Sequence, residues 1–257
     1  MNNSKVYTAF SSKGIFTYDE FNKKFKNSKH SSRVLLHYLV KNKILGTIKR
    51  ELYFTIPYGS PVDYSPEPIL IGSKLSPQDY YLGYHSALEV HGVAYSKYES
   101  VYVNASNGFK KFNFKGITFY NITPVKHDYK TGIETRIYSN NTIKISDRER
   151  TIIDCLDRIS LAGGVEEFLK SVKMFPSVNP GKIYKYLVKI GKKNLFNKVG
   201  WMLDLFRINW GIKKSFLDKI ENNLTEHVVY LDKSKSKYNK KWKIMIPENI
   251  NQLLSED

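Results

Sequence analysis

Prolines are concentrated in one short segment of this chain. Five of the nine lie within residues 57–77, PYGSPVDYSPEPILIGSKLSP, together with two glycines. Proline fixes the backbone φ angle and removes a hydrogen-bond donor, so neither a helix interior nor a central strand accommodates such a segment. We therefore predict a proline-rich linker over residues 58–76, which separates a domain at 1–57 from a larger one at 77–257.

The first domain has the pattern of three helices. Apolar side chains recur at helical spacing in residues 3–11, and Thr17 with Glu20 forms a capping-box pattern that opens a second helix. A third helix is expected from about Ser28 to Asn42. There the stripe of Val34, Leu35, Tyr38 and Leu39 would pack on the first two helices and leave the polar side chains outside.

A β-hairpin is predicted directly after the third helix. Residues 45–49 and 52–56 alternate apolar and polar side chains around a tight turn at Lys49-Arg50-Glu51. Three helices followed by a hairpin have the order of a winged helix-turn-helix. In that fold the third helix enters the major groove of DNA and the hairpin, or wing, contacts the neighbouring backbone.

Positive charge supports this interpretation. The chain has a formal net charge of +17, and residues 1–57 hold eleven Lys and Arg against three Asp and Glu, a net +8. Such a surface attracts phosphate backbones. The predicted DNA-binding residues are those of the third helix and the wing: Lys29, His30, Ser31, Ser32, Arg33, His37, Lys41, Lys49 and Arg50. Docking of another protein is an alternative, because winged helices also serve as protein-interaction modules.

The region after the linker predicts a larger, mixed α+β domain. Ser76-Pro77 is typical of a helix start, and that helix would run to Gly92. Alternating segments between residues 100 and 146 predict strands, and helices are expected at about 148–159, 165–174, 180–190, 194–207 and 213–222. Ser146 and Glu149 form a second capping-box pattern, and KWKIMIP, residues 241–247, would rejoin the sheet.

Candidate catalytic residues are few. His85 and His91 lack the spacing of a metal-binding helix, and we interpret both as structural; no glycine-rich phosphate loop is present. No cofactor or metal is expected. An acidic cluster, Asp147, Glu149, Asp154 and Asp157, leaves one alternative open, a metal-dependent nucleic-acid-processing enzyme with a winged-helix substrate-binding domain.

One further basic tract lies near the end of the chain. Residues 233–244, KSKSKYNKKWKI, interleave six lysines with Tyr238 and Trp242. Basic and aromatic residues in this pattern suit stacking on single-stranded nucleic acid. A solvated loop leading into a strand, with Trp242 buried, explains the same pattern.

Several segments, in order along the chain, match those of a known family. They are the hairpin pattern G-x-I-x-R-x-x-Y at 46–53, YHSALEVHGV at 84–93, RERTIIDCLDR at 148–158, VGWMLDLF at 199–206 and KKWKI at 240–244. In these segments the chain resembles the AbiEi-type antitoxins of type IV toxin-antitoxin and abortive-infection systems. It departs from them at Leu52, where the family often has glycine. It also lacks the family's arginine near Lys198.

The resemblance implies a function that composition does not. A protein of this kind would repress transcription by binding repeated half-sites in its own promoter as double-stranded DNA. Its second domain would counter a cognate nucleotidyltransferase-like toxin, with no need for direct contact. It would not be an enzyme.

A cytoplasmic location is expected. The chain has no run of about 18 apolar residues and no signal-peptide pattern at its start, so no membrane association is predicted. The single cysteine, Cys155, cannot form an internal disulfide, which fits a reducing compartment.

Overall fold

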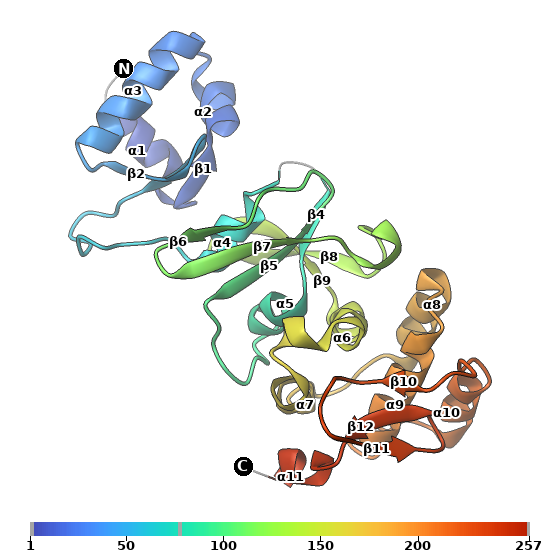
Figure 1. The fold of residues 1–257 in the computed structure, drawn as a ribbon. Helices are drawn as coiled ribbons and strands as arrows, with labels where there is room; N and C mark the ends of the chain where they lie inside the picture. The colour runs from blue at the N-terminus through green and yellow to red at the C-terminus, as the bar shows by residue number, and fades with distance from the viewer. Residues whose placement is uncertain (1–2, 77–78, 256–257) are drawn as a thin grey trace.

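The chain is described here by a computed structural model that covers residues 3–76 and 79–255. The fold is mixed α+β, as predicted, and the described residues form three sheets, with helices distributed along the chain. Three separate clusters of buried hydrophobic side chains form its cores. They correspond to an N-terminal unit, a central six-stranded sheet and a C-terminal helical region, which follow one another across the molecule (Figure 1).

The N-terminal unit, residues 3–56, contains the three expected helices and the hairpin. The helices are α1 (Asn3–Ser11), α2 (Tyr18–Phe25) and α3 (Lys29–Lys41), and the hairpin joins β2 (Leu45–Lys49) to β3 (Leu52–Thr55). A short strand that the sequence analysis did not predict, β1 (Ile15–Thr17), pairs antiparallel with β3 and gives the order β1-β3-β2. The predicted capping box at Thr17 and Glu20 is confirmed.

The proline-rich linker is only partly extended. Residues 68–73, inside the predicted linker, form the helix α4 (Pro68–Ser73), in which Ile69, Leu70 and Ile71 are buried. Pro68 occupies the first turn, where a missing backbone N–H breaks no helical hydrogen bond, so proline starts this helix instead of preventing it. The prediction of an extended linker that no helix could include was therefore wrong for residues 68–73.

The central sheet has six strands in the order β6-β7-β5-β4-β9-β8. Its strands are β4 (Tyr80–Leu82), β5 (Ser100–Ala105), β6 (Phe112–Phe114), β7 (Ile117–Ile122), β8 (Ile133–Tyr138) and β9 (Asn141–Ser146). Parallel pairing of β4 with β9 and of β5 with β7 makes the sheet mixed. A short 3-10 turn, Val125–His127, follows β7.

The helix predicted from Ser76-Pro77 to Gly92 is much shorter. Tyr80–Leu82 form the central strand β4, and the helix α5 covers only Tyr84–Val90; Pro77 itself lies outside the described residues. Both flanks of β4 are occupied by hydrogen-bonded strands, β5 and β9. Cross-strand pairing of two adjacent tyrosines outweighs the local helix signal here.

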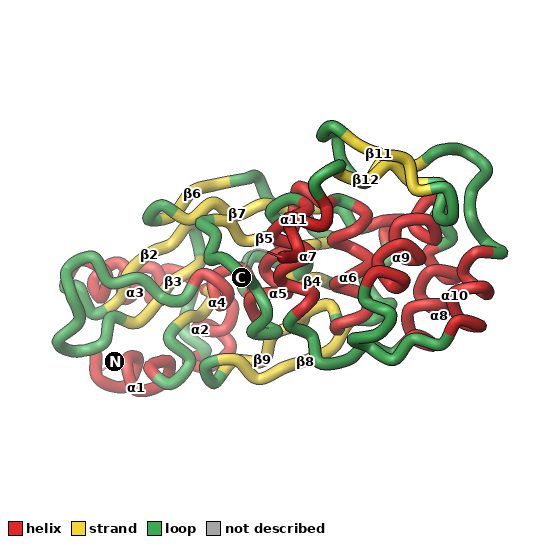
Figure 2. The backbone as a smooth tube through the Cα atoms, turned by 90° about the horizontal axis from the view of Figure 1, so that it is seen from below, coloured by secondary structure: helices red, strands yellow, loops and turns green. Residues whose placement is uncertain are grey.

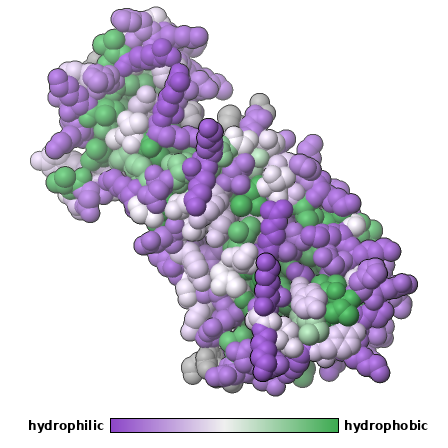
Figure 3. Space-filling view, viewed as in Figure 1, coloured by the Kyte–Doolittle hydropathy of each residue, from purple (hydrophilic) through white to green (hydrophobic). Residues whose placement is uncertain are grey.

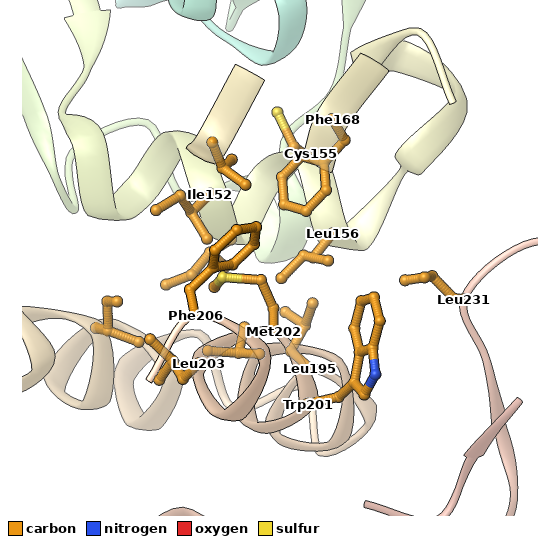
Figure 4. Packing of buried hydrophobic residues seen from close by; sticks show 14 of the residues in the cluster. Ile152, Cys155, Leu156, Phe168, Leu195, Trp201, Met202, Leu203, Phe206 and Leu231 are labelled. Carbon is orange, nitrogen blue, oxygen red and sulfur yellow. The ribbon is translucent and has the colours of Figure 1, made fainter. Parts of the chain in front are cut away.

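The C-terminal region packs helices against one face of a small three-stranded sheet. Its helices are α6 (Arg148–Asp157), α7 (Val165–Lys173), α8 (Pro180–Ile190), α9 (Asn194–Leu205), α10 (Lys214–Glu221) and α11 (Ile250–Ser255), with a 3-10 turn at Ile159–Ala162. Figure 4 shows Ile152 and Leu156 of α6 pointing toward Met202 and Phe206 at α9. Among residues 3–76 and 79–255, no helix has the length and apolar character needed to cross a bilayer.

Two further sequence predictions about this region were wrong. Residues 244–247 do not rejoin the six-stranded sheet, because β12 (Ile244–Pro247) lies between β10 (Val229–Tyr230) and β11 (Ser236–Asn239) in a sheet of its own. The cap of α6 is Asp147, whose carboxylate accepts from the Arg150 amide at 2.8 Å. Glu149 instead accepts from the Asn179 amide at 2.8 Å and so holds the start of α8.

Close packing at Gly200 of α9 gives a test of this architecture. A Cβ at Gly200 would lie 2.2 Å from the Trp242 ring and 2.9 Å from Ile220. We expect Gly200→Ala to lower the free energy of unfolding by about 1–3 kcal/mol, because overpacking exceeds the gain in helix propensity. Urea denaturation measures the change. The control Gly181→Ala, near the solvent-exposed start of α8, should change stability by less than about 0.5 kcal/mol; equal losses would contradict the packing.

Candidate nucleic-acid interface

Helix α3 turns a narrow apolar side inward. Ser28 caps the helix and accepts from the Ser31 amide at 3.1 Å. The buried positions are Ser32, Leu36 and Leu39, which are spaced four and three residues apart along one face. The Ser32 hydroxyl donates to the Asn22 side-chain oxygen at 2.6 Å. Ser32 is fully buried, so its predicted role as a DNA contact was wrong: the hydroxyl joins α3 to α2.

The outer side of α3 is basic. The exposed polar side chains are those of Lys29, His30, Ser31, Arg33, His37 and Lys41. No Asp or Glu occurs in the helix. The helix lies toward one end of the molecule in both Figure 1 and Figure 2, on the side of the N-terminal unit away from the C-terminal helices. Six of the seven predicted helix contacts therefore share one accessible surface.

Two apolar side chains belong to the same outer surface. Val34 is 56% exposed and Tyr38 is 47% exposed, although the sequence analysis placed both in the core. The true inner face is turned by about one residue from the predicted stripe. Hydropathy alone does not identify the inner face, because that face includes the polar residue Ser32. Its hydroxyl can be buried because it is hydrogen-bonded to Asn22.

The hairpin tip is arranged differently from the prediction. Lys49 is half-buried, and its Nζ lies 5.6 Å from the centre of the Phe109 ring and 5.5 Å from that of Phe112. Burial lowers the pKa of this lysine. Lys49 is therefore held against the central sheet by cation–π contacts, and the proposed pairing of its charge with a phosphate does not fit this position.

Arg50 is the cation that the hairpin does present to solvent. Its side chain is 88% exposed, with Nε 3.9 Å from Glu51 Oε1. Glu51 completes the tight turn with a φ of 65°. The tip overlooks a crevice of about 550 Å³ lined by α2, α4 and β4, so it faces the central sheet while α3 faces outward.

Polar contacts fix the N-terminal unit to the rest of the chain. Lys74, just after α4, has its Nζ 2.6 Å from Glu20 Oε1. The side-chain Nδ2 of Asn141 donates to the Lys13 carbonyl at 2.7 Å. Burial opposes ionisation of Glu20, but hydrogen bonds from Lys74 and the Thr17 amide outweigh it and lower the carboxyl pKa. These contacts join residues more than 50 positions apart.

The acidic cluster does not converge on one point. Asp147 accepts from the Tyr186 hydroxyl at 2.8 Å, Asp154 pairs with Arg150 at 2.7 Å, and Asp157 pairs with Lys192. The described residues contain no group of three His, Cys, Asp or Glu side chains placed to hold a metal ion. The arrangement gives no support to the metal-dependent alternative.

The two histidines of helix α5 and its C-terminal end have structural partners. Fully buried His85 lies with Nε2 3.1 Å from Glu167 Oε1 and Nδ1 3.2 Å from Glu89 Oε1. His91 Nε2 lies 2.9 Å from the Ser146 carbonyl oxygen. Both side chains tie α5 to neighbouring elements, as the structural interpretation requires.

The segments that resemble the antitoxin family also have structural roles. The Ser86 hydroxyl accepts from the Tyr102 amide at 2.9 Å and so links α5 to β5. Buried Arg150 donates to Asp154 at 2.7 Å, to the Thr131 carbonyl at 2.9 Å and to the Tyr81 hydroxyl at 3.1 Å. These residues hold α5, α6 and the sheet together.

Comparison with known proteins shows the fold alone. No protein-family model matches the chain, and no curated protein matches it. Among solved structures, the RV2827C protein from Mycobacterium tuberculosis is similar, with a TM-score of 0.64 and 10% sequence identity. The match covers 98% of this chain and 92% of that protein. The two chains therefore share an arrangement of elements over nearly their whole length.

The Glu20–Lys74 contact predicts a pH-dependent stability. Because folding lowers the pKa of Glu20, its contribution is present above the unfolded pKa and is lost as pH falls through the folded value. Glu20→Gln keeps a capping-box side chain but loses the charge, and we expect it to cost about 0.5–1 kcal/mol at pH 7, allowing for solvent screening. Urea midpoints of the two proteins should converge below the folded pKa.

The exposed carboxylate Glu51 provides the control for this test. Its replacement by glutamine should leave the midpoint nearly unchanged at both ends of the pH range. A Glu20→Gln deficit that persists unchanged at low pH would exclude the ion pair as its cause.

Proposed function

We propose that this chain is a cytoplasmic, DNA-binding transcriptional repressor that acts as the antitoxin of a type IV toxin-antitoxin system. The observation that carries the DNA-binding part is the outer side of α3, where Lys29, Arg33 and Lys41 are exposed on a helix without any acidic residue. Phosphate backbones attract such a surface, and a single helix fits the major groove.

The order of elements supports a winged helix-turn-helix interpretation of the N-terminal unit. Helix α3 follows α2 after a short turn and precedes the β2–β3 hairpin, as in proteins of that fold. In this proposal Arg33 reads a base, because a guanidinium pairs bidentately with guanine, while Lys29 and Lys41 hold phosphates at the two ends of the helix. Val34 and Tyr38 supply apolar contact of the kind that thymine methyl groups accept.

The wing contributes less than its sequence suggests. With Lys49 held on the rings of Phe109 and Phe112, only Arg50 of the adjacent pair remains for the backbone. The operator would consist of repeated half-sites in the promoter of the protein's own gene. Helix α3 of one protein copy would bind each half-site.

The antitoxin part of the proposal rests on the family resemblance of segments 46–53, 84–93, 148–158, 199–206 and 240–244. The buried contacts of Ser86, Arg150 and Asp154 are compatible with it, since a fold-defining role explains why such segments recur together. The partner would be a nucleotidyltransferase-like toxin, whose gene is expected beside this one.

Arg33 provides the sharpest test of duplex binding. Arg33→Ala should weaken binding to a duplex from the chain's own promoter by about fivefold to 150-fold and relax specificity at one base pair. Fluorescence anisotropy over a range of salt concentrations measures affinity and slope. Arg207→Ala, an exposed arginine after α9, is the matched control and should bind as the unmodified chain does. If the two variants bind alike, α3 is not the reading helix.

The antitoxin role is tested by co-expression with the neighbouring toxin. Produced from an unrelated promoter, the full chain should restore growth to toxin-expressing cells, measured as colony counts. Arg33→Ala should restore growth equally while losing repression of a promoter reporter, because the two roles lie in different parts of the chain. Failure of the unmodified chain to restore growth would refute antitoxin activity. It would not refute DNA binding, which the anisotropy and reporter assays measure separately.

A further inference from the structure

The small C-terminal sheet, β10-β12-β11, has one buried face and one open face. Ile244 and Ile246 of β12 and Val229 of β10 are buried against the helices. Trp242 is also buried, and its indole Nε1 donates to Asp204 at 2.9 Å. In Figure 2 β11 and β12 lie at the edge of the molecule with α9 on one side only. The other face of this sheet is therefore open to solvent.

Two tyrosines lie in one row across the open face. Met245 of β12 is directly opposite Tyr230 of β10 and Tyr238 of β11 in the strand pairing. Tyr230 is 61% exposed and Tyr238 is 50% exposed. Residues paired in this way project from the same face of a sheet. The tyrosine row, Tyr230–Met245–Tyr238, thus spans two strand spacings, or about 10 Å.

Lysines are frequent in the strands and turns that carry this row. Residues 228–245 contain six lysines and a single acidic residue, Asp232. Lys235 pairs with Glu248 and Lys241 with Asp204. The other four, Lys233, Lys237, Lys240 and Lys243, make no ion pair with any residue that the structure describes. Lys237 is paired with buried Ile246 and so projects from the opposite face of the sheet, which leaves Lys233, Lys240 and Lys243 for the open face. Figure 3 shows pale and green residues bordered by purple ones over this part of the molecule.

We propose that the open face of the β10-β12-β11 sheet binds single-stranded nucleic acid. Bases would stack on Tyr230 and Tyr238, with Met245 as an apolar contact between them, while Lys233, Lys240 and Lys243 neutralise the phosphates. Aromatic rings next to a positively charged surface are the features that unpaired bases require, and base pairs in a duplex do not offer a free ring face to such a row. Trp242, the other aromatic residue of the tract, is too deeply buried to take part.

This site is distinct from the duplex surface of α3. The N-terminal unit and the C-terminal sheet lie at opposite ends of the chain and of the molecule (Figure 1). Binding here does not depend on the proposed repressor function, so each proposal can fail alone.

Fluorescence anisotropy with the full chain tests the site, using labelled oligothymidine and oligouridine of about 12 nucleotides. Comparing the affinities for oligothymidine and oligouridine shows whether the site prefers DNA or RNA. Tyr230→Ala and Tyr238→Ala should each weaken binding by about fivefold to 150-fold, while the Phe variants keep the ring and retain affinity. Tyr58→Ala, which removes a fully exposed ring elsewhere, is the matched control and should have no effect.

The lysines give a second measurement. Replacing Lys240 and Lys243 with glutamine should reduce the slope of log affinity against log salt by up to about 1.4, because each single-strand phosphate that a lysine neutralises contributes about 0.7 to that slope. Repeating the titrations with Arg33→Ala should leave single-strand affinity unchanged. Circular dichroism verifies that every variant is folded.

Four outcomes would overturn the proposal. The first three are no single-strand binding by the unmodified chain, equal affinity in the alanine variants, and equal losses for the Phe and Ala variants, which would exclude stacking. Binding of polyglutamate with the same dependence on Tyr230 and Tyr238 would overturn it in favour of an acidic protein partner.

Discussion

The arrangement of this protein depends on a hydrophobic cluster that the N-terminal hairpin shares with the central sheet. Ile48, Leu52 and Phe54 of the hairpin are buried in one cluster with Ile69 and Ile71 of α4 and with side chains of the sheet. Separating the two would expose this apolar surface, at a cost of about 25 cal/mol for each Å². The hairpin therefore belongs to two cores at once. Its two strands form part of the N-terminal sheet, and its buried side chains pack against the central six-stranded sheet.

That shared cluster orients the charged surfaces. Because the hairpin faces inward, its tip is directed into the crevice beside α4, and α3 on the far side of the unit is left open. The basic helix and the hairpin tip thus have different surroundings, although they are close in sequence. At the other end of the chain, packing also decides which surface is open. Helix α9 lies on one face of the β10-β12-β11 sheet, and the other face is left uncovered.

Sequence patterns predicted the helices and most strands well, because apolar periodicity and capping residues act locally. The exceptions occur where distant contacts decide. Pro68 begins a helix because Ile69–Ile71 have a core to enter, and Tyr80–Leu82 form a strand because β5 and β9 flank them. In the candidate site, six of the seven residues predicted on α3 are exposed. Ser32 is not, because its hydroxyl finds a partner in Asn22, and no pattern within α3 indicates that bond.

Local sequence was sufficient to predict the three N-terminal helices and the hairpin, the basic character of the N-terminal unit and the lysine-rich tract near the C-terminus. These properties follow from composition and from spacing along a few turns or strands. Tertiary structure alone decided which charges are accessible. Lys49 and Arg50 are neighbours in the chain, yet one lies against Phe109 and Phe112 and the other in solvent. Tyr238 and Trp242 share one tract, yet only the tyrosine is exposed. Exposure depends on which distant element covers a side chain, and local sequence does not contain that information.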